Sequence, residues 1–338
     1  MAKPLQTRTL RATARNLAFL ARRLRAGEIV AVPTETVYGL AGNALDPAAC
    51  AKIFRAKGRP ASDPLIVHLH SAAQLPQVCQ PNSAALKLAR RFWPGPLTLV
   101  LPKTAAVPGI VTAGRDSVAV RVPSHPVFRR LLKLTGVPLA APSANRFGYI
   151  SPTTARHVRE GLGGKIRHIL DGGAAQIGLE STILDLRDPR RPVLLRPGAI
   201  TLADIRSVLP RVTESRRTAR AAVTTAKSIG LVAPGLLARH YSPRTLVVLH
   251  AVIPLPRATS SDARDAWVFL RRPRIGKKTA PNIFWLDERG TLPGAARRLF
   301  ATLRTIDAIK FRRIHVELAP DRGLGRAIND RLRRAAAR

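Results

Sequence analysis

Short runs of β-branched and other apolar residues alternate with helical stretches along the first 200 residues, and this alternation most constrains the fold. The runs IVAVP, LIVHLH, LTLVLP, VAVRVP and VPLAAP are predicted strands at 29–33, 65–70, 97–102, 118–123 and 137–142. Helices are expected near 47–57, 83–91 and 126–134, which indicates an α/β fold. Three more strands are expected at 168–173, 181–186 and 192–197, with little helix between them. We therefore predict a mixed, twisted sheet with flanking helices instead of a doubly wound sheet.

A second α/β pattern begins at Thr245. Its strands are expected at 245–250, 266–270, 282–286 and 313–318, and its helices near 293–306 and 323–336. This order favours a smaller, Rossmann-like C-terminal domain, but no GxGxxG follows a strand, so dinucleotide binding is not supported. The stretch ESRRTARAAVTTAKS has no apolar period and indicates a linker. We predict domains at 1–205 and 245–338, with 206–244 as a linker between them.

The chain is strongly basic, because 57 Lys and Arg residues against 20 Asp and Glu residues give a net charge of +37. A genome that favours Arg and Ala would explain this excess, and so would selection for a polyanionic partner. With 46% hydrophobic residues, the chain should nevertheless bury a core. Leu17, Leu20 and Leu24 recur at helical spacing, so we interpret the basic N-terminus as a first helix and not as a transit segment.

Several classes of protein and site are excluded. Cys50 and Cys79 cannot build a disulfide framework or a four-ligand zinc site. No stretch of about 18 apolar residues is present, so we expect a soluble cytoplasmic protein without a membrane partner. The motifs GxxxxGK[ST], HExxH and GxSxG are missing, so any nucleotide must be held in another way.

Polar residues stand at the edges of the predicted strands. The segment 32–42, VPTETVYGLAG, places Thr34, Glu35, Thr36 and Tyr38 after a strand, where they could line a cleft. A capped strand-to-helix turn would use the same residue types.

The segment 57–65, KGRPASDPL, presents Lys57 and Arg59 on a short, proline-bounded arc that suits phosphate oxygens. A solvated surface loop is the alternative for this segment.

Two polar side chains interrupt apolar strands. His68 lies within LIVHLH, where a core histidine is the alternative to a functional one. Arg121 lies within VAVRVP and needs an anionic partner, which could be Asp116 or a ligand.

The segment 141–155, APSANRFGYISPTTA, adds Ser143, Asn145 and Ser151 ahead of an expected helix start. That helix start could present free N–H groups to a phosphate, whereas ordinary capping explains Ser151 equally well. GLESTILDL and LLRPGAI add Ser181 and Arg196.

The order and the amino-acid sequences of these segments closely resemble those of the YrdC-type threonylcarbamoyl-AMP synthases. The resemblance spans nearly all of 13–200 and is carried by PTETVYGLAGNA, the KGRP…PL loop, FWPGPLTLVLP, VAVRVPSHP, PLAAPSAN, ISPTTA, ILDGG, GLESTILDL and LLRPGAI. APGLLARHYSPR (233–244) resembles the linker signature of the long two-domain members, and GLGRAINDRLRRAA (323–336) resembles the end of their C-terminal domain. The implied fold is a YrdC-like mixed, twisted sheet plus the small Rossmann-like domain.

The resemblance implies an enzyme that condenses L-threonine, bicarbonate and ATP into threonylcarbamoyl-AMP with release of pyrophosphate. Partner proteins of the tRNA threonylcarbamoyltransferase machinery would then modify the adenosine beside the anticodon, with weak tRNA binding by this chain as a further expectation. Mg²⁺ is expected on the triphosphate and no organic cofactor is expected, while the metal ligands stay unidentified.

The resemblance also assigns roles to residues. Lys57 and Arg59 match the catalytic KxR residues. Residues expected on the ATP side are Lys57, Arg59, Asp63, Ser117, Ser143, Asn145, Ser151, Arg196 and Tyr241. Residues expected around threonine are Thr34, Thr36, His68, Arg121, Ala141 and Ser181, with Arg121 pairing with the amino acid's carboxylate. His240 and Tyr241 match linker residues that fold over the cleft.

Two other functions compete with the synthase. A non-enzymatic RNA-binding protein would fit the net charge, but aromatic residues make up only 4% of the chain, which is unfavourable for base stacking. A module related to the hydrogenase-maturation carbamoyltransferases should carry cysteine clusters for zinc, and two cysteines do not provide them.

Overall fold

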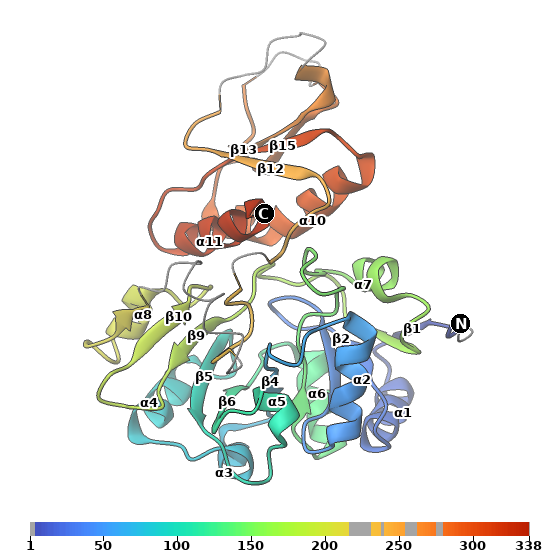
Figure 1. Cartoon of the computed structure of the whole chain (residues 1–338), viewed down its shortest axis with the longest axis vertical. Helices are drawn as coiled ribbons and strands as arrows, with labels where there is room; N and C mark the ends of the chain where they lie inside the picture. Colours follow the sequence, from blue (N-terminus) through green and yellow to red (C-terminus); the bar gives the residue numbers. More distant parts are fainter. Residues whose placement is uncertain (1–3, 216–230, 238–239, 254–261, 275–279, 338) are drawn as a thin grey trace.

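The computed structural model describes the chain except residues 1–3, 216–230, 238–239, 254–261, 275–279 and 338. Arg216 and Arg217, together with most of the Arg-rich stretch interpreted as linker, lie outside the described residues. The described part forms two α/β domains, one with a large mixed sheet and one with a small parallel sheet (Figure 1). The predicted fold class is thereby confirmed.

Within the described residues, the first sheet has eleven strands. Their order across the sheet is β1 (Arg8–Arg11), β8 (His168–Asp171), β2 (Val30–Val32), β3 (Gly39–Asn43), β7 (Leu139–Ala140), β4 (Ile66–His68), β6 (Ser117–Arg121), β5 (Leu97–Pro102), β9 (Thr182–Asp185), β10 (Val193–Arg196) and β11 (Thr213–Glu214). Parallel and antiparallel pairs are both present, as β4 pairs in parallel with β6 and antiparallel with β7.

Three strands of this sheet were absent from the sequence-based prediction. β1 is polar and largely exposed, β3 contains two glycines, and β11 has two residues, so none carries the apolar alternation of a typical strand. β3 pairs antiparallel with β2, which makes the strand-to-helix interpretation of 32–42 wrong. β11 pairs with β10 and thereby extends the first sheet into the segment predicted as linker.

Helices cover both faces of the first sheet. They are α1 (Ala14–Arg25), α2 (Pro47–Lys57), α3 (Leu75–Val78), α4 (Ser83–Phe92), α5 (Gly109–Thr112), α6 (Pro126–Thr135), α7 (Ala155–Leu162) and α8 (Leu202–Arg206), with a 3₁₀ turn at Ala72–Gln74. Neighbouring residues of β2 separate the faces: Val30 and Val32 belong to the apolar cluster that contains α1 and α6, whereas Ala31 belongs to the cluster that contains α2 and α4. α1 buries Leu17, Leu20 and Leu24, as the helical spacing predicts.

Part of the face that carries α1 and α6 is covered by the linker instead of by a helix. Ile66 of β4 and Ala119 of β6 face this way and pack with Ala233 of the linker. Because side chains alternate along a strand, His68 and Arg121 project from the same face as Ile66 and Ala119. The sheet thus presents two polar side chains in the strip between α6 and the linker.

The second sheet is fully parallel, with the order β12 (Leu246–His250), β15 (Arg313–Glu317), β13 (Ala266–Arg271) and β14 (Ile283–Asp287). A 3₁₀ turn at Asp262–Arg264 precedes β13. The helices α10 (Leu292–Ile309) and α11 (Leu324–Ala336) pack on one face of this sheet and lie between it and the first domain (Figure 1). Their apolar cluster includes Val37, Ile150, Leu179 and Tyr241, so the two domains share buried apolar surface. None of the described helices combines the length and the apolar character needed to cross a membrane.

Candidate active site

A small cavity lies on the face of the first sheet between β4, β6, β9 and the linker. Eleven of the predicted site residues line it: Thr34, Thr36, Arg59, His68, Arg121, Ala141, Ser143, Ser181, Arg196, His240 and Tyr241. Its wall also includes Glu180, Pro234 and Gly235. The predicted residues Lys57, Asp63, Ser117, Asn145 and Ser151 are not among the lining residues. The cavity measures about 50 Å³.

Arg121 and His68 are neighbours in this cavity because β4 and β6 run in parallel with these two residues in register. Arg121 forms a buried ion pair with Glu35, whose Oε1 lies 2.5 Å from Nη2. Its Nη1 donates to Thr36 Oγ1 at 3.1 Å and its Nε donates to the Gly95 carbonyl at 3.1 Å. The protein partner of Arg121 is therefore Glu35, and the suggestion of Asp116 is wrong.

Electrostatics fix the charge states on this side of the cavity. Burial by itself would raise the pKa of Glu35, but Arg121 and the Ser124 N–H outweigh burial and hold that pKa below its usual value. Burial, with a further contribution from Arg121, lowers the pKa of His68 to about 3. His68 is thus a neutral imidazole, and Arg121 and Glu35 are a charged pair.

The loop after β2 adds two hydroxyl groups to the same side. Thr34 Oγ1 donates to the Val37 carbonyl at 2.6 Å and lies 2.8 Å from Thr36 Oγ1. The backbone N–H groups of Thr36 and Val37 point back to Thr34 Oγ1, so the side chain holds a tight turn. Thr36 is held in turn by Arg121.

Lys57 and Arg59 are buried, although Gly58 between them is exposed, so the interpretation of two solvated cations on a surface loop is wrong. α2 ends at Lys57, and Gly58 follows with a φ of 64°, which returns the chain toward the core. Lys57 Nζ donates to the carbonyls of Ser143, at 2.5 Å, and of Asn145, at 2.7 Å. Through these two hydrogen bonds Lys57 holds the segment after β7 in place, and Lys57 itself does not line the cavity.

Arg59 is clamped by the loop that follows it. Its guanidinium donates to the carbonyls of Asp63, at 2.9 Å, and Pro64, at 2.7 Å, and it pairs with the Asp63 carboxylate at 3.0 Å. Burial, and the nearby charge of Arg59, lower the pKa of Lys57 well below its usual value. Burial raises the pKa of Asp63, and this effect exceeds the opposing influence of Arg59 and Lys57. Lys57 and Arg59 therefore lie close enough together for the charge of one to affect the other.

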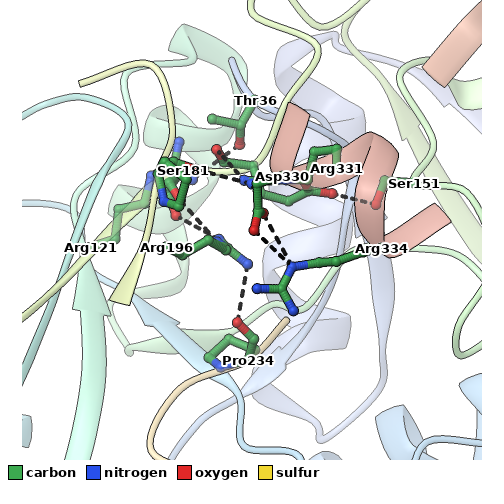
Figure 2. A network of polar contacts seen from close by, with 11 residues as sticks. Thr36, Arg121, Ser151, Ser181, Arg196, Pro234, Asp330, Arg331 and Arg334 are labelled. Atoms are coloured by element: carbon green, nitrogen blue, oxygen red, sulfur yellow. Dashed lines mark hydrogen bonds and ion pairs between the residues drawn. The ribbon is translucent and has the colours of Figure 1, made fainter. Parts of the chain in front are cut away.

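Arg196, at the end of β10, connects the sheet to the linker (Figure 2). Its Nε donates to the Ser181 carbonyl at 3.1 Å and its Nη2 donates to Ser181 Oγ at 3.2 Å. Its Nη1 donates to the carbonyl of Pro234 in the linker at 3.2 Å. Ser181 Oγ also lies 2.8 Å from Thr98 Oγ1 of β5, so its position is set from both sides.

The described linker residues close the cavity. Tyr241 is buried with a φ of 61°, a conformation that costs a non-glycine residue energy. Gly235 has a φ of 73° and no room for a side chain, because an added Cβ would lie 2.7 Å from both Arg196 Nη1 and Tyr241 Oη. The ring of His240 packs edge-on against Tyr241, with ring centres 4.2 Å apart. Burial, then the charges of Arg59 and Lys57, lower the pKa of His240 well below its usual value.

Ser151, Asn145 and Ser117 lie outside the cavity lining. Ser151 Oγ donates to Glu180 Oε1 at 2.5 Å. The N-cap of α7 is Thr154, which accepts from the His157 N–H, so Ser151 does not cap this helix. Asn145 Nδ2 donates to the carbonyls of Arg146 and Tyr149. Ser117 lies buried at the start of β6, on the same face of that strand as Ala119 and Arg121.

Sequence reasoning missed Glu180 as a lining residue and missed the residues of α11 that hold it. Glu180 stands beside Ser181 in GLESTILDL, so its position next to a predicted site residue was the available signal. Arg331 of α11 donates from Nε to Glu180 Oε2 at 2.8 Å. Hydrophobic periodicity reports only local structure, so it could not have shown that Glu180 and Arg331 are in contact.

The carboxylates around the cavity are engaged with arginines: Glu35 with Arg121, Asp63 with Arg59 and Glu180 with Arg331. Among the described residues, no group of three or more His, Cys, Asp or Glu side chains could hold a metal ion. The described wall therefore suits anionic ligands and provides no protein cage for a cation.

Both parts of the chain match known protein families. Residues 22–198 match the family described as "Telomere recombination", and residues 200–337 match "Threonylcarbamoyl-AMP synthase, C-terminal domain". The chain is 43% identical over 324 residues to the threonylcarbamoyl-AMP synthase of Pyrococcus abyssi, covering 93% of this chain and 92% of that protein. It is 39% identical over 327 residues to the Bacillus subtilis threonylcarbamoyl-AMP synthase, covering 95% and 92%. The crystal structure of P. abyssi Sua5 complexed with L-threonine superposes with a TM-score of 0.84 at 40% identity, covering 98% of this chain and 97% of that one.

Proposed function

This chain belongs to the threonylcarbamoyl-AMP synthase family, and on that premise we propose that it joins L-threonine, bicarbonate and ATP into threonylcarbamoyl-AMP and releases pyrophosphate. The observation that carries the proposal is the set of three buried guanidinium groups, from Arg59, Arg121 and Arg196, around one cavity. A reaction that brings several anions together needs such fixed positive charge, because each anion would otherwise repel the next.

The bond changes follow from the substrates. The threonine amine and bicarbonate give a carbamate and water, so a carbon–nitrogen bond forms. A carbamate oxygen then attacks the α-phosphorus of ATP, and the bond from that phosphorus to the bridging oxygen of pyrophosphate breaks. Negative charge grows on the leaving pyrophosphate, where Arg59 and Arg196 would stabilise it. We assign no side chain as a proton-transfer group.

We assign the threonine side to the cavity wall formed by Thr34, Thr36, His68, Arg121 and Ser181. Arg121 is held by Glu35, Thr36 and Gly95, so its guanidinium is already oriented before a ligand arrives. A carboxylate next to it would gain a charge-assisted hydrogen bond. The neutral imidazole of His68 and the hydroxyls of Thr36 and Ser181 suit the amine and hydroxyl of threonine. The P. abyssi protein crystallised with L-threonine supports an amino-acid site in this fold.

We assign the nucleotide to the wall formed by Arg59, Ser143 and Arg196, with Lys57 and Asn145 supporting it from behind. Mg²⁺ would enter as part of the MgATP substrate, coordinated by phosphate oxygens and water, since the nearby carboxylates are paired with arginines. Gly235, His240 and Tyr241 line the cavity and are themselves buried, so the linker covers it. We therefore propose that Gly235, His240 and Tyr241 move outward to admit the substrates.

The experiment measures pyrophosphate release from MgATP with and without L-threonine and bicarbonate. We expect release to require both substrates, and chromatography of the reaction to show threonylcarbamoyl-AMP. Pyrophosphate release that is independent of threonine and bicarbonate, or no release at all by the folded protein, would overturn the proposal. In the proposed function, other proteins transfer the threonylcarbamoyl group from threonylcarbamoyl-AMP to tRNA.

A further inference from the structure

We propose that Arg331, in the last helix of the second domain, is a positioning residue for the nucleotide side of the cavity. The assignment rests on the proposed function, because that function defines which wall binds the nucleotide. Arg331 belongs to α11 and its side chain is fully buried. It projects out of the second domain into the first, beside Ser181 and Arg196 (Figure 2).

Arg331 holds Glu180 at two points. Its Nε donates to Glu180 Oε2 at 2.8 Å, and its Nη2 donates to the Glu180 carbonyl at 3.4 Å. Its Nη1 donates to the carbonyl of Pro197, the residue after Arg196, at 3.0 Å. Glu180 lines the cavity, and its other oxygen accepts from Ser151 at 2.5 Å. A single guanidinium thus fixes both the acid on the cavity wall and the backbone next to Arg196.

Arg331 also contacts the linker. Its guanidinium carbon lies 5.4 Å from the centre of the Tyr241 ring, within the range of a cation–π interaction. One turn later on α11, the Arg334 carbonyl accepts from the His240 N–H at 3.3 Å. α11 therefore holds the two linker residues that close the cavity, as well as the wall they close against.

The charges of this cluster balance. Glu180 and Asp330 are the acids, and Arg331 and Arg334 are the bases. Arg331 Nη1 pairs with Asp330 at 2.6 Å, and Arg334 Nε lies 3.1 Å from the other Asp330 oxygen. Replacing a buried ion pair by apolar residues is often neutral for stability, and apolar side chains already join the two domains here. The ion pairs are therefore better explained by the orientation they impose than by the stability they add.

Among the described residues, the side chain of Arg331 contacts Glu180, Pro197, Asp330 and Tyr241, and none of these belongs to the wall assigned to threonine. Glu180, Pro197 and Tyr241 adjoin Arg196 and the linker, whereas Arg121 is held by Glu35, Thr36 and Gly95 of the first domain. A residue that merely stabilised the fold would affect both sides alike. A positioning residue for the nucleotide should affect ATP binding much more than threonine binding.

The test replaces Arg331 by Met, which keeps the length and apolar contacts of the side chain, and by Lys, which keeps the charge but not the forked geometry. Arg333→Ala is the matched control, since Arg333 lies in the same helix and is exposed. Isothermal titrations with MgATP and with L-threonine are run separately, and steady-state KM values are measured for both. We expect the Kd and KM for ATP to rise about tenfold in Arg331→Met, with those for threonine within about twofold of wild type. Arg331→Lys should give an intermediate change in ATP binding, and Arg333→Ala should give none.

A second variant addresses the possibility that Arg331→Met loses stability because Glu180 is left unpaired. In Glu180→Gln/Arg331→Met the buried charge is removed together with its partner, so the melting temperature should recover relative to Arg331→Met. ATP binding should stay about tenfold weaker, because Tyr241 and the Pro197 backbone are still not held. Equal losses of ATP and threonine binding, or recovery of ATP binding together with stability, would show that Arg331 is only structural. A wild type without threonine-dependent turnover contradicts the proposed function, and the ATP titrations of the variants decide the role of Arg331 independently.

Discussion

The two sides of the cavity are built in different ways. On the threonine side, Arg121, Glu35, Thr36 and His68 belong to one domain and are fixed by contacts within it. On the nucleotide side, the wall is assembled from the first domain and the linker, and α11 of the second domain contacts this wall from outside the cavity. The first arrangement is preformed, whereas the second depends on the relative position of two domains. We therefore expect the threonine side to withstand changes in domain contacts that would disturb the nucleotide side.

We expect the largest effect from a substitution of Arg121, on the threonine side of the cavity. Arg121→Ala removes the cation proposed for the threonine carboxylate and leaves Glu35 buried without its partner, at a cost of about 3–5 kcal/mol in stability. We expect kcat/KM for threonine to fall by about a thousandfold while ATP binding persists in the folded fraction. Titration calorimetry with each substrate measures both effects. Arg130→Ala, an exposed arginine of α6, is the control. Unchanged threonine binding in a folded Arg121→Ala protein would contradict the assignment of the two sides.

The second prediction concerns stability against acid and the neutral state of His68. The pKa of His68 is about 3 in the folded protein against 6.5 in the unfolded chain, so below pH 6.5 the unfolded chain takes up a proton that the folded protein does not. Stability is therefore lost as the pH falls, with a slope of about 1.4 kcal/mol per pH unit for this group. Urea unfolding at pH 7, 6 and 5 measures the slope. Glu35 should contribute little here, because its pKa is 4.5 in the unfolded chain and lower in the folded protein, so both states are mainly ionised above pH 5.

His68→Asn should reduce the slope of the unfolding free energy between pH 6.5 and 5 by about 1.4 kcal/mol per pH unit. It keeps a polar side chain in the cavity but removes the titrating group. A slope should remain, because the pKa values of His157 and His240 are also lowered by burial. If the variant and the wild type lose stability in parallel over this range, His68 does not control the acid sensitivity.

A third, smaller effect is expected on the nucleotide side. Gly235→Ala adds a Cβ that would lie 2.7 Å from Arg196 Nη1 and from Tyr241 Oη, so the linker must shift. We expect the KM for ATP to rise about tenfold and the threonine Kd to change little. Gly114→Ala is the control, since Gly114 has a similar φ of 77° but nothing within 4 Å of the added atom. Equal effects of the two substitutions would mean that backbone strain, and not the contact with Arg196, is responsible.

The sequence also predicted the threonine side of the cavity better than the nucleotide side. The threonine side lies on strands with strong apolar alternation, and the sequence placed His68 and Arg121 there, although it did not identify Glu35 as the partner of Arg121. That ion pair depends on how the loop after β2 folds over β6, which no local pattern reports.

On the nucleotide side, the sequence brought out the KxR segment and Arg196, but the contacts that hold them come from distant segments. Lys57 was expected at the nucleotide, and the structure shows its Nζ bound to backbone carbonyls behind the cavity. Arg331 lies within GLGRAINDRLRRAA, whose resemblance pointed to the end of a C-terminal domain and not to a site, because an arginine near the end of an Arg-rich helix looks like an ordinary solvated residue. Net charge was equally uninformative here, since buried and exposed arginines count alike in the value of +37.

The smallest predicted effect lies where the two sides meet. Ser181 is held by Thr98 on one side and by Arg196 on the other, so it links a residue assigned to threonine with one assigned to ATP. Thr98→Val removes one hydrogen bond of about 1 kcal/mol with little change of shape, and leaves Ser181 bound to Arg196 alone. Because Ser181 can then follow Arg196, both KM values should rise together by about twofold to threefold, unlike the one-sided changes in Arg121→Ala and Gly235→Ala. Steady-state kinetics in both substrates measures this. A change confined to one substrate would show that Ser181 belongs to that side only, and that the two walls are mechanically independent.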